Sequence, residues 1–225
     1  MKVLLVAATP FEMAPTDHFL TEHFDKNKAG IFQKNELEVE SLITGVGMPL
    51  TGFALGRAFA REQYDLAINA GVAGAIRPDL EIGSVVHVVS ERWGDLGVEE
   101  ADGSFTDIHE MGLISPDEPP FSEGVLHNAS VEGFDFLPKV RGLTVNKVHG
   151  SAASIEAMRR KYEVDVETME GAAFFLACLL SETPFLEIRS ISNRVEPRNR
   201  EGWNLPLAID RLNETLMGIL NLLAG

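Results

Sequence analysis

The sequence contains a single cysteine, Cys178, among 225 residues, so no disulfide bond can form within the chain. Cys178 lies in the apolar run 172–180, where a buried, small hydrophobic side chain is the expected role. No neighbouring charge in the sequence favours a reactive thiolate. The lack of a disulfide fits a reducing compartment, and we therefore expect a cytoplasmic protein.

Long hydrophobic runs are also missing. The apolar run at 3–8 is interrupted by Pro10 and Glu12, so it is too short for a membrane span and fits a signal peptide poorly. A buried first strand is the better interpretation, and no association with a membrane is predicted.

Basic residues are scarce, with 19 Lys and Arg against 34 Asp and Glu, which gives a net charge of −15. Such a surface repels a phosphate backbone, so a nucleic-acid partner is not expected. A small nucleoside carries little charge and stays compatible with the composition. The chain is long enough to bury a substantial core, and hydrophobic residues make up 45% of it.

Short apolar segments alternate with amphipathic ones along the chain, a pattern typical of parallel strands connected by helices. We predict an α/β fold in three layers, α/β/α, with a central mixed, mostly parallel sheet in one domain spanning residues 1–225. The Gly- and Pro-rich region 93–138 is interpreted as an irregular insertion with one helix at 121–129. Strands are predicted at 3–8, 30–33, 37–44, 65–70, 84–90, 143–148, 164–167 and 185–191, and helices at 11–24, 49–61, 154–161, 169–180 and 205–223.

Glu12 is the first candidate for a catalytic side chain. Residues 9–12, Thr-Pro-Phe-Glu, fit a capping box in which Thr9 is the N-cap and Glu12 is the third helical residue. This structural role explains the residues by itself. The helix nevertheless begins at the carboxyl end of the first strand, where open α/β sheets bind their ligands. Glu12 is therefore also a candidate general base.

Glu170 is the second candidate, at the start of the apolar helix that follows strand 164–167. Thr168 can cap this helix, which would place Met169 and Glu170 in its first turn, where a carboxylate is favoured by the helix dipole. The two oxygens of Glu170 are equally suited to accept hydrogen bonds from two neighbouring ribose hydroxyls. Both roles stay open.

Asn193 is the third candidate, because it follows the strand at 185–191. Asn is common in turns, yet its amide can donate and accept at once, which matches N7 and O6 of a 6-oxopurine. The glycines at 45–47 and 71–74 also follow strands and can let a ligand approach the backbone, and Gly74 is included among the expected substrate contacts. Neither segment is a dinucleotide or phosphate-binding pattern. The histidines at 87, 109, 127 and 149 lack metal-ligand spacing, so neither a cofactor nor a metal is predicted.

Together these residues resemble the purine nucleoside phosphorylase and nucleosidase superfamily over residues 1–75 and 143–223. The chain is most similar to the nucleosidases, and among them to the futalosine hydrolases. The resemblance implies that Glu12 activates water, that Met169 and Glu170 hold the ribose, and that Ser192 and Asn193 meet the base. It also implies hydrolysis of an N-glycosidic bond through an oxocarbenium-like state, and a homo-oligomer.

Asn193 stands where the adenine-specific nucleosidases have an aspartate. A protonated Asp can donate to N7 of adenine, whereas Asn can bond N7 and O6 of hypoxanthine. The resemblance therefore favours futalosine, a 6-oxopurine nucleoside, over methylthioadenosine. Cleavage would release hypoxanthine, a step that feeds menaquinone synthesis in some lineages.

Two parts of the expected site have no assigned residue. Segment 150–155, GSAASI, lacks the aromatic that stacks on the base in nucleosidases. The alternatives are Phe134, Phe136, Trp203 or a site without a stacking aromatic. The carboxylate of futalosine would require a cation, for which the candidates are Arg198, Arg194 and Arg200.

Other functions stay open from the sequence. A phosphorylase would bind phosphate through arginines, but residues 9–16 contain none, and Arg57 is expected to be exposed on a helix. A methylthioadenosine nucleosidase is a further alternative. A non-catalytic nucleoside-binding homologue would keep Glu12 and Glu170 only as helix caps.

Overall fold

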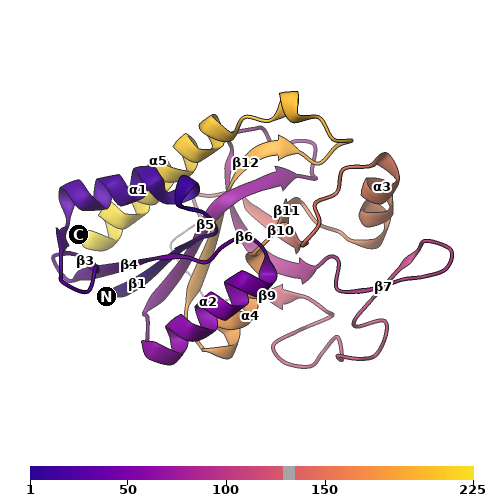
Figure 1. The fold of residues 1–225 in the computed structure, drawn as a ribbon, viewed down its shortest axis with the longest axis horizontal. Helices are drawn as coiled ribbons and strands as arrows, with labels where there is room; N and C mark the ends of the chain where they lie inside the picture. The colour runs from indigo at the N-terminus through magenta and orange to yellow at the C-terminus, as the bar shows by residue number, and fades with distance from the viewer. Residues whose placement is uncertain (129–134) are drawn as a thin grey trace.

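A ten-stranded sheet forms the centre of the molecule in the computed structural model, which describes residues 1–128 and 135–225 (Figure 1). The strands lie in the order β11-β10-β6-β12-β5-β1-β4-β3-β2, and β9 pairs with β6. They are β1 (Lys2–Ala7), β2 (Asp25–Lys26), β3 (Phe32–Lys34), β4 (Leu37–Ile43), β5 (Leu66–Ala75), β6 (Val85–Trp93), β9 (Leu126–His127), β10 (Lys139–Thr144), β11 (Val166–Thr168) and β12 (Phe185–Arg194).

The strand directions are mixed, and the sheet closes on itself. β12, β5, β1 and β4 are mutually parallel, whereas β6 runs antiparallel to β12. β10 and β11 follow the direction of β6, and β11 then pairs antiparallel with β5, where Glu167 lies opposite Gly74. This last pairing brings the start of the segment containing Met169 and Glu170 to the carboxyl end of β5.

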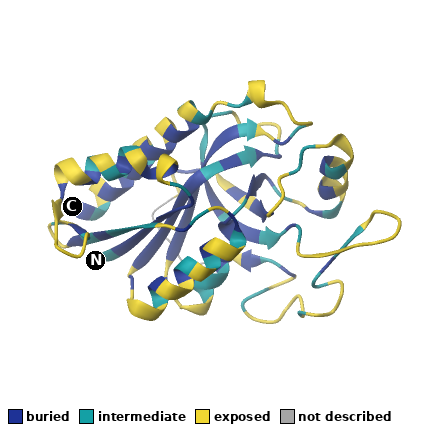
Figure 2. Ribbon diagram, viewed as in Figure 1, coloured by how far each residue is buried: buried dark blue, intermediate teal, exposed yellow. Residues whose placement is uncertain are grey.

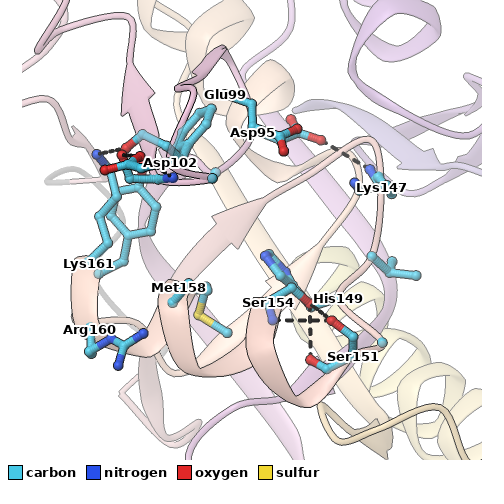
Figure 3. A pocket seen from close by; sticks show the side chains of 18 residues that line it. Asp95, Glu99, Asp102, Lys147, His149, Ser151, Ser154, Met158, Arg160 and Lys161 are labelled. Carbon is cyan, nitrogen blue, oxygen red and sulfur yellow. Dashed lines mark hydrogen bonds between the residues drawn. The ribbon is translucent and has the colours of Figure 1, made fainter.

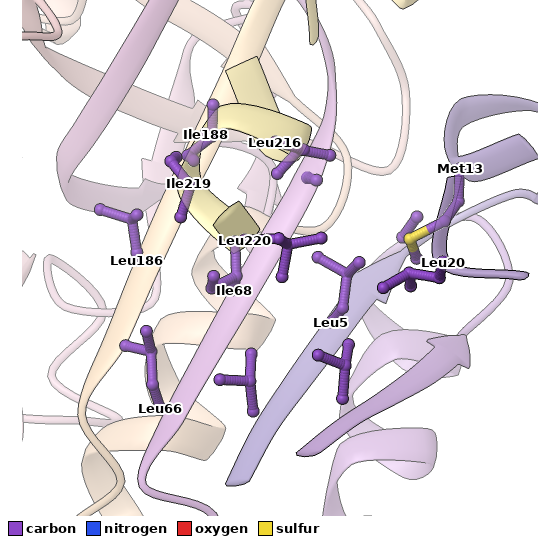
Figure 4. Close-up of a cluster of buried hydrophobic side chains, with 14 of the residues drawn as sticks. Leu5, Met13, Leu20, Leu66, Ile68, Leu186, Ile188, Leu216, Ile219 and Leu220 are labelled. Atoms are coloured by element: carbon purple, nitrogen blue, oxygen red, sulfur yellow. The ribbon is translucent and has the colours of Figure 1, made fainter. Parts of the chain in front are cut away.

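Helices cover both faces of the sheet, as predicted. α1 (Pro10–His23) and α5 (Leu205–Ala224) lie on one face, and α2 (Met48–Arg61) and α4 (Gly171–Leu180) lie on the other (Figure 1). Burial follows these layers, with dark strands inside and exposed outer helix surfaces (Figure 2). The first core cluster joins α1 and α5 to the sheet through Met13, Leu20, Leu216 and Leu220, which pack against Leu5 and Ile68 (Figure 4).

The remaining elements lie at one end of the molecule. α3 (Ala152–Lys161) packs beside a two-stranded ribbon made of β7 (Gly97–Glu99) and β8 (Phe105–Asp107), and the short helix η1 (Arg200–Gly202) precedes α5 (Figure 1). The helix predicted at 121–129 is wrong within the described residues. Ser122 bridges to Val125 in a turn in which Glu123 and Gly124 have positive φ angles, and β9 follows it. Ala129 lies outside the described residues.

Several element ends differ from the prediction because long-range pairing sets them. β10 occupies residues 139–144 rather than 143–148, since it pairs along the length of β6. The glycines at 71–74 lie inside β5 and not in a turn. Asn193 likewise lies inside β12, after a bulge between Ile191 and Asn193. α4 begins only at Gly171, so Glu170 is its N-cap residue.

Candidate active site

Glu12 forms the predicted capping box, and it also contacts a second strand. The backbone N–H and the hydroxyl of Thr9 donate to Oε2 at 3.0 and 2.8 Å. The other oxygen, Oε1, accepts from the N–H of Val72 in β5 at 3.2 Å. The side chain is only 8% exposed. The capping interaction therefore holds the carboxylate between Thr9, after β1, and Val72 of β5. The capping role is compatible with a place in the expected site.

Glu170 points towards the same region from α4. It is 6% exposed, and its Oε1 accepts from the N–H of Gly47, the N-cap residue of α2, at 3.0 Å. Burial raises the pKa of Glu170, although the positive charge of Arg189 opposes this shift. Met169, directly before it, is half-buried.

Arg189 joins the two carboxylates, although no motif in the sequence singled it out. Its side chain is completely buried, and Nη1 lies 3.9 Å from Oε2 of Glu170. A Cβ added at Gly71 would stand 2.1 Å from Nη1 of Arg189 and 3.0 Å from Oε1 of Glu12, so a glycine is required where these groups meet. Among the described residues, Nη1 and Nη2 have no hydrogen-bond partner. The guanidinium group therefore has unused N–H groups between Glu12 and Glu170.

A buried carboxylate keeps Arg189 charged. Nε of Arg189 donates to Oε1 of Glu187 at 2.7 Å, and neither side chain is exposed. Burial alone would lower the pKa of Arg189, but Glu187 and Glu170 outweigh burial and raise it. The signal in the sequence was two charged residues, Glu187 and Arg189, inside the mostly apolar strand 185–191.

Asn193 lines a small cavity of about 60 Å³. Its Oδ1 accepts from the hydroxyl of Ser192 at 2.8 Å, and its amide donates to the carbonyl of Arg194 at 3.0 Å. A Cβ at Gly74 would stand 3.2 Å from Nδ2 of Asn193, so the backbone of β5 approaches this amide closely. The structure thus brings Gly74, Ser192 and Asn193 together.

The two parts of the site lie along the same strand. Gly71 faces Glu12 and Arg189, whereas Gly74 faces Asn193. Three residues of a β-strand span about 10 Å, which is the scale of a nucleoside. A ligand lying along the end of β5 would contact both parts.

The candidates for stacking on the base and for binding a carboxylate differ in their position relative to the cavity of Asn193. Trp203 and Arg198 line the cavity with Asn193, and the guanidinium of Arg198 lies 5.2 Å from the Trp203 ring centre. Phe136 does not line it, and Phe134 lies outside the described residues. Arg194 donates to the carbonyl of Pro78 at 2.8 Å, and Arg200 lies in η1.

A larger cavity of about 950 Å³ lies between α3 and the ribbon β7–β8 (Figure 3). Polar side chains such as Asp95, Lys147 and Arg160 line it, and none of the predicted site residues does. It adjoins the smaller cavity, because both are lined by Val148 and His149.

Other chemistry finds less support. Within residues 1–128 and 135–225, no group of three or more His, Cys, Asp and Glu side chains could hold a metal ion. In the same part of the chain, no helix has the length and apolar character needed to cross a membrane. Burial raises the pKa of the Cys178 thiol well above its ordinary value, which disfavours a nucleophilic role.

A family model described as the phosphorylase superfamily matches residues 2–221. This chain belongs to the phosphorylase superfamily. A futalosine hydrolase from Acidothermus cellulolyticus is 33% identical over 79% of this chain and 73% of its own length. Another from Streptomyces coelicolor is 32% identical over 68% of this chain, which spans 64% of that relative.

The fold is also found in a solved structure of this superfamily. The futalosine hydrolase of Helicobacter pylori matches with a TM-score of 0.77 at 15% identity, covering 98% of this chain and 97% of that protein. The predicted superfamily, its α/β fold and its N-glycosyl hydrolase activity are therefore confirmed.

Proposed function

We propose that this protein hydrolyses the N-glycosidic bond of futalosine and releases hypoxanthine. The observation that carries the proposal is the placement of Glu12 and Arg189 beside Gly71 of β5, with Glu170 3.9 Å from Arg189. Asn193 of β12 lies beside Gly74, three residues further along β5. The similarity to futalosine hydrolases supports the choice of substrate.

Each residue has a separate role in this mechanism. Glu12, whose carboxylate is oriented by Thr9 and Val72, takes the proton of the attacking water. Glu170 accepts hydrogen bonds from the 2′ and 3′ hydroxyls of the ribose, and Met169 packs beside the sugar. Asn193, supported by Ser192 and approached by the backbone at Gly74, stabilises the base as negative charge develops on it.

The distal part of the substrate lies outside this core. We propose Arg198 as the partner of the futalosine carboxylate. Arg194 and Arg198 both line the cavity of Asn193, but Arg194 donates to the carbonyl of Pro78, whereas the guanidinium of Arg198 donates no hydrogen bond within the described residues. Trp203 is the stacking aromatic, since it lines the same cavity.

Water is the proposed nucleophile rather than phosphate. Residues 9–16 contain no arginine, and Arg57 is exposed on α2, where it lies over Phe53. The buried guanidinium of Arg189 is already balanced by Glu187 and Glu170. A phosphate dianion beside Glu12 and Glu170 would meet two carboxylates, which disfavours its binding.

We further infer that the active form is a homo-oligomer. The site described above is formed by residues of one copy of the chain. The cytoplasmic location and the single domain over residues 1–225 stay predictions from the sequence.

One assay tests the function. The protein is incubated with futalosine, inosine and methylthioadenosine, with and without phosphate, and the free base is measured. We expect hypoxanthine from futalosine without phosphate. Release that requires phosphate would instead identify a phosphorylase, and no release from any substrate would leave a binding protein.

The variant Glu12→Gln tests the mechanism in the same assay. The amide cannot take a proton, so kcat should fall by roughly 10²–10⁴. Turnover that survives within about tenfold would contradict the role of Glu12 as the general base.

A further inference from the structure

We propose that His149, held by Glu167, is a second catalytic residue, which donates a proton to the departing base. This inference rests on the proposed hydrolysis and extends it to the leaving-group side of the reaction. The sequence pattern alone gave no indication that His149 and Glu167 belong to the site.

The pair is built into the wall of the cavity that contains Asn193. Glu167 lies in β11 opposite Gly74, and His149 lies in the loop between β10 and α3. Nδ1 of His149 is in direct contact with Oε2 of Glu167, and the backbone N–H of His149 donates to Oε1 at 3.1 Å. The two side chains are 16% and 5% exposed. Both line the cavity with Gly74 and Asn193.

The contact with Glu167 leaves one ring nitrogen free to act. Nδ1 is occupied, and Nε2 makes no hydrogen bond within the described residues. To donate from Nε2 while Nδ1 donates to Glu167, the ring must carry a proton on both nitrogens, and the carboxylate of Glu167 is placed to accept from Nδ1. The other charged side chains that line the cavity are Arg194, Glu196 and Arg198, and none of them forms a hydrogen bond or an ion pair with His149 within the described residues.

The reaction needs such a donor because Asn193 can form hydrogen bonds but cannot transfer a proton. When the C1′–N9 bond breaks, its electron pair passes to the purine, which would leave as an anion. A proton from Nε2 of His149 neutralises a ring nitrogen of the base. Glu12 meanwhile takes a proton from water as the new C1′–O bond forms. Glu12 then releases its proton to solvent and His149 regains one, so that one water is consumed in each turnover.

A purely structural role for the pair would be to fix the loop before α3. The backbone bond from His149 to Glu167 serves that purpose, so the variant must spare it. His149→Gln keeps the backbone N–H and a polar side chain but cannot deliver a proton. An exposed histidine on α1 provides the matched control, His18→Gln.

The first experiment compares two leaving groups on the same sugar. kcat/KM is measured for futalosine and for an analogue in which 4-nitrophenolate, which departs without a proton, replaces hypoxanthine. We expect His149→Gln to lose about 10²-fold or more on futalosine, the range typical of general acid catalysis, and much less on the analogue. Glu167→Gln should show the same selectivity, and His18→Gln should resemble the wild type. Equal losses of His149→Gln on both substrates, or no loss on futalosine, would overturn the proposal.

The second experiment does not depend on turnover. Calorimetry measures the Kd of hypoxanthine, which His149→Gln should weaken about tenfold because the ring N–H that bonds the base is lost. An unchanged Kd would count against the proposal. Wild-type protein that releases no base would contradict the proposed function instead, and the hypoxanthine titration would still test His149 separately.

Discussion

At the scale of single residues, the site depends on charges that are buried beneath it. Glu91, Glu187 and Arg189 are all completely buried. The hydroxyls of Thr144 and Thr168 donate to Glu91 at 2.8 and 3.2 Å. Burial and the nearby Glu187 raise the pKa of Glu91 well above its ordinary value. We therefore interpret Glu91 as protonated and Glu187 as the ionised partner of Arg189.

The raised pKa of Glu91 predicts a dependence of stability on pH. The folded protein retains a proton that the unfolded chain releases above the ordinary glutamate pKa of 4.5. The contribution of Glu91 to the free energy of unfolding should therefore be highest below this value and fall as the pH rises, by up to about 1.4 kcal/mol per pH unit until the folded pKa is reached. Glu91→Gln mimics the protonated acid and should reduce this loss, as measured by urea unfolding at pH 5 and pH 8. The exposed control Glu36→Gln should keep the wild-type difference, and an equal difference in Glu91→Gln would refute protonation.

At the scale of elements, a glycine lets α4 begin above these buried acids. A Cβ at Gly171 would lie 2.1 Å from Oε1 of Glu91 and 2.7 Å from Oε1 of Glu187. Gly142 in β10 approaches Glu91 just as closely, at 2.2 Å. The acid pair therefore occupies space that only glycine leaves open between β10 and α4.

Gly171→Ala should consequently lower the stability of the protein, whereas Gly→Ala substitutions in helices usually raise it. Gly→Ala in a helix ordinarily stabilises by roughly 0.5–1 kcal/mol, and Gly218→Ala should do so, because a Cβ added at Gly218 in α5 would meet no atom within 4 Å. Gly171→Ala should instead destabilise by about 1–3 kcal/mol through overpacking. Denaturant unfolding of both variants checks this, and stabilisation by Gly171→Ala would contradict the crowding.

The sequence predicted the elements better than their ends. Thr9 and Glu12 form a local capping box, which spacing alone can reveal. The extension of β5 to Ala75 and of β12 to Arg194 depends on pairing between distant segments, which local periodicity does not contain. The roles of Glu187 and Arg189 were missed for the same reason. Arg189 is recognised as part of the site only through its contact with Glu170, which lies at the start of α4.

At the scale of the whole molecule, α2 exposes large apolar side chains. Leu50 is 53% exposed and Phe53 is 67% exposed, next to Val46 at 48%. These residues flank Gly47, whose N–H binds the carboxylate of Glu170. Clustered exposed apolar residues are typical of an interaction surface. A second copy of the chain covering α2 would therefore stabilise the ribose side of the site.

A charged substitution on this surface should both dissociate the oligomer and lower kcat/KM. Phe53→Glu places a charge where the apolar contact is expected, so light scattering should report the chain mass of 24.6 kDa, against at least twice that value for the wild type. Because Gly47 and Glu170 lie beside the surface, kcat/KM for futalosine should fall in parallel. Leu222→Glu, at a 75% exposed position on α5, should change neither quantity. A wild-type protein with the mass of one chain would rule out the oligomer, and a Phe53→Glu variant with the wild-type mass would rule out α2 as its interface.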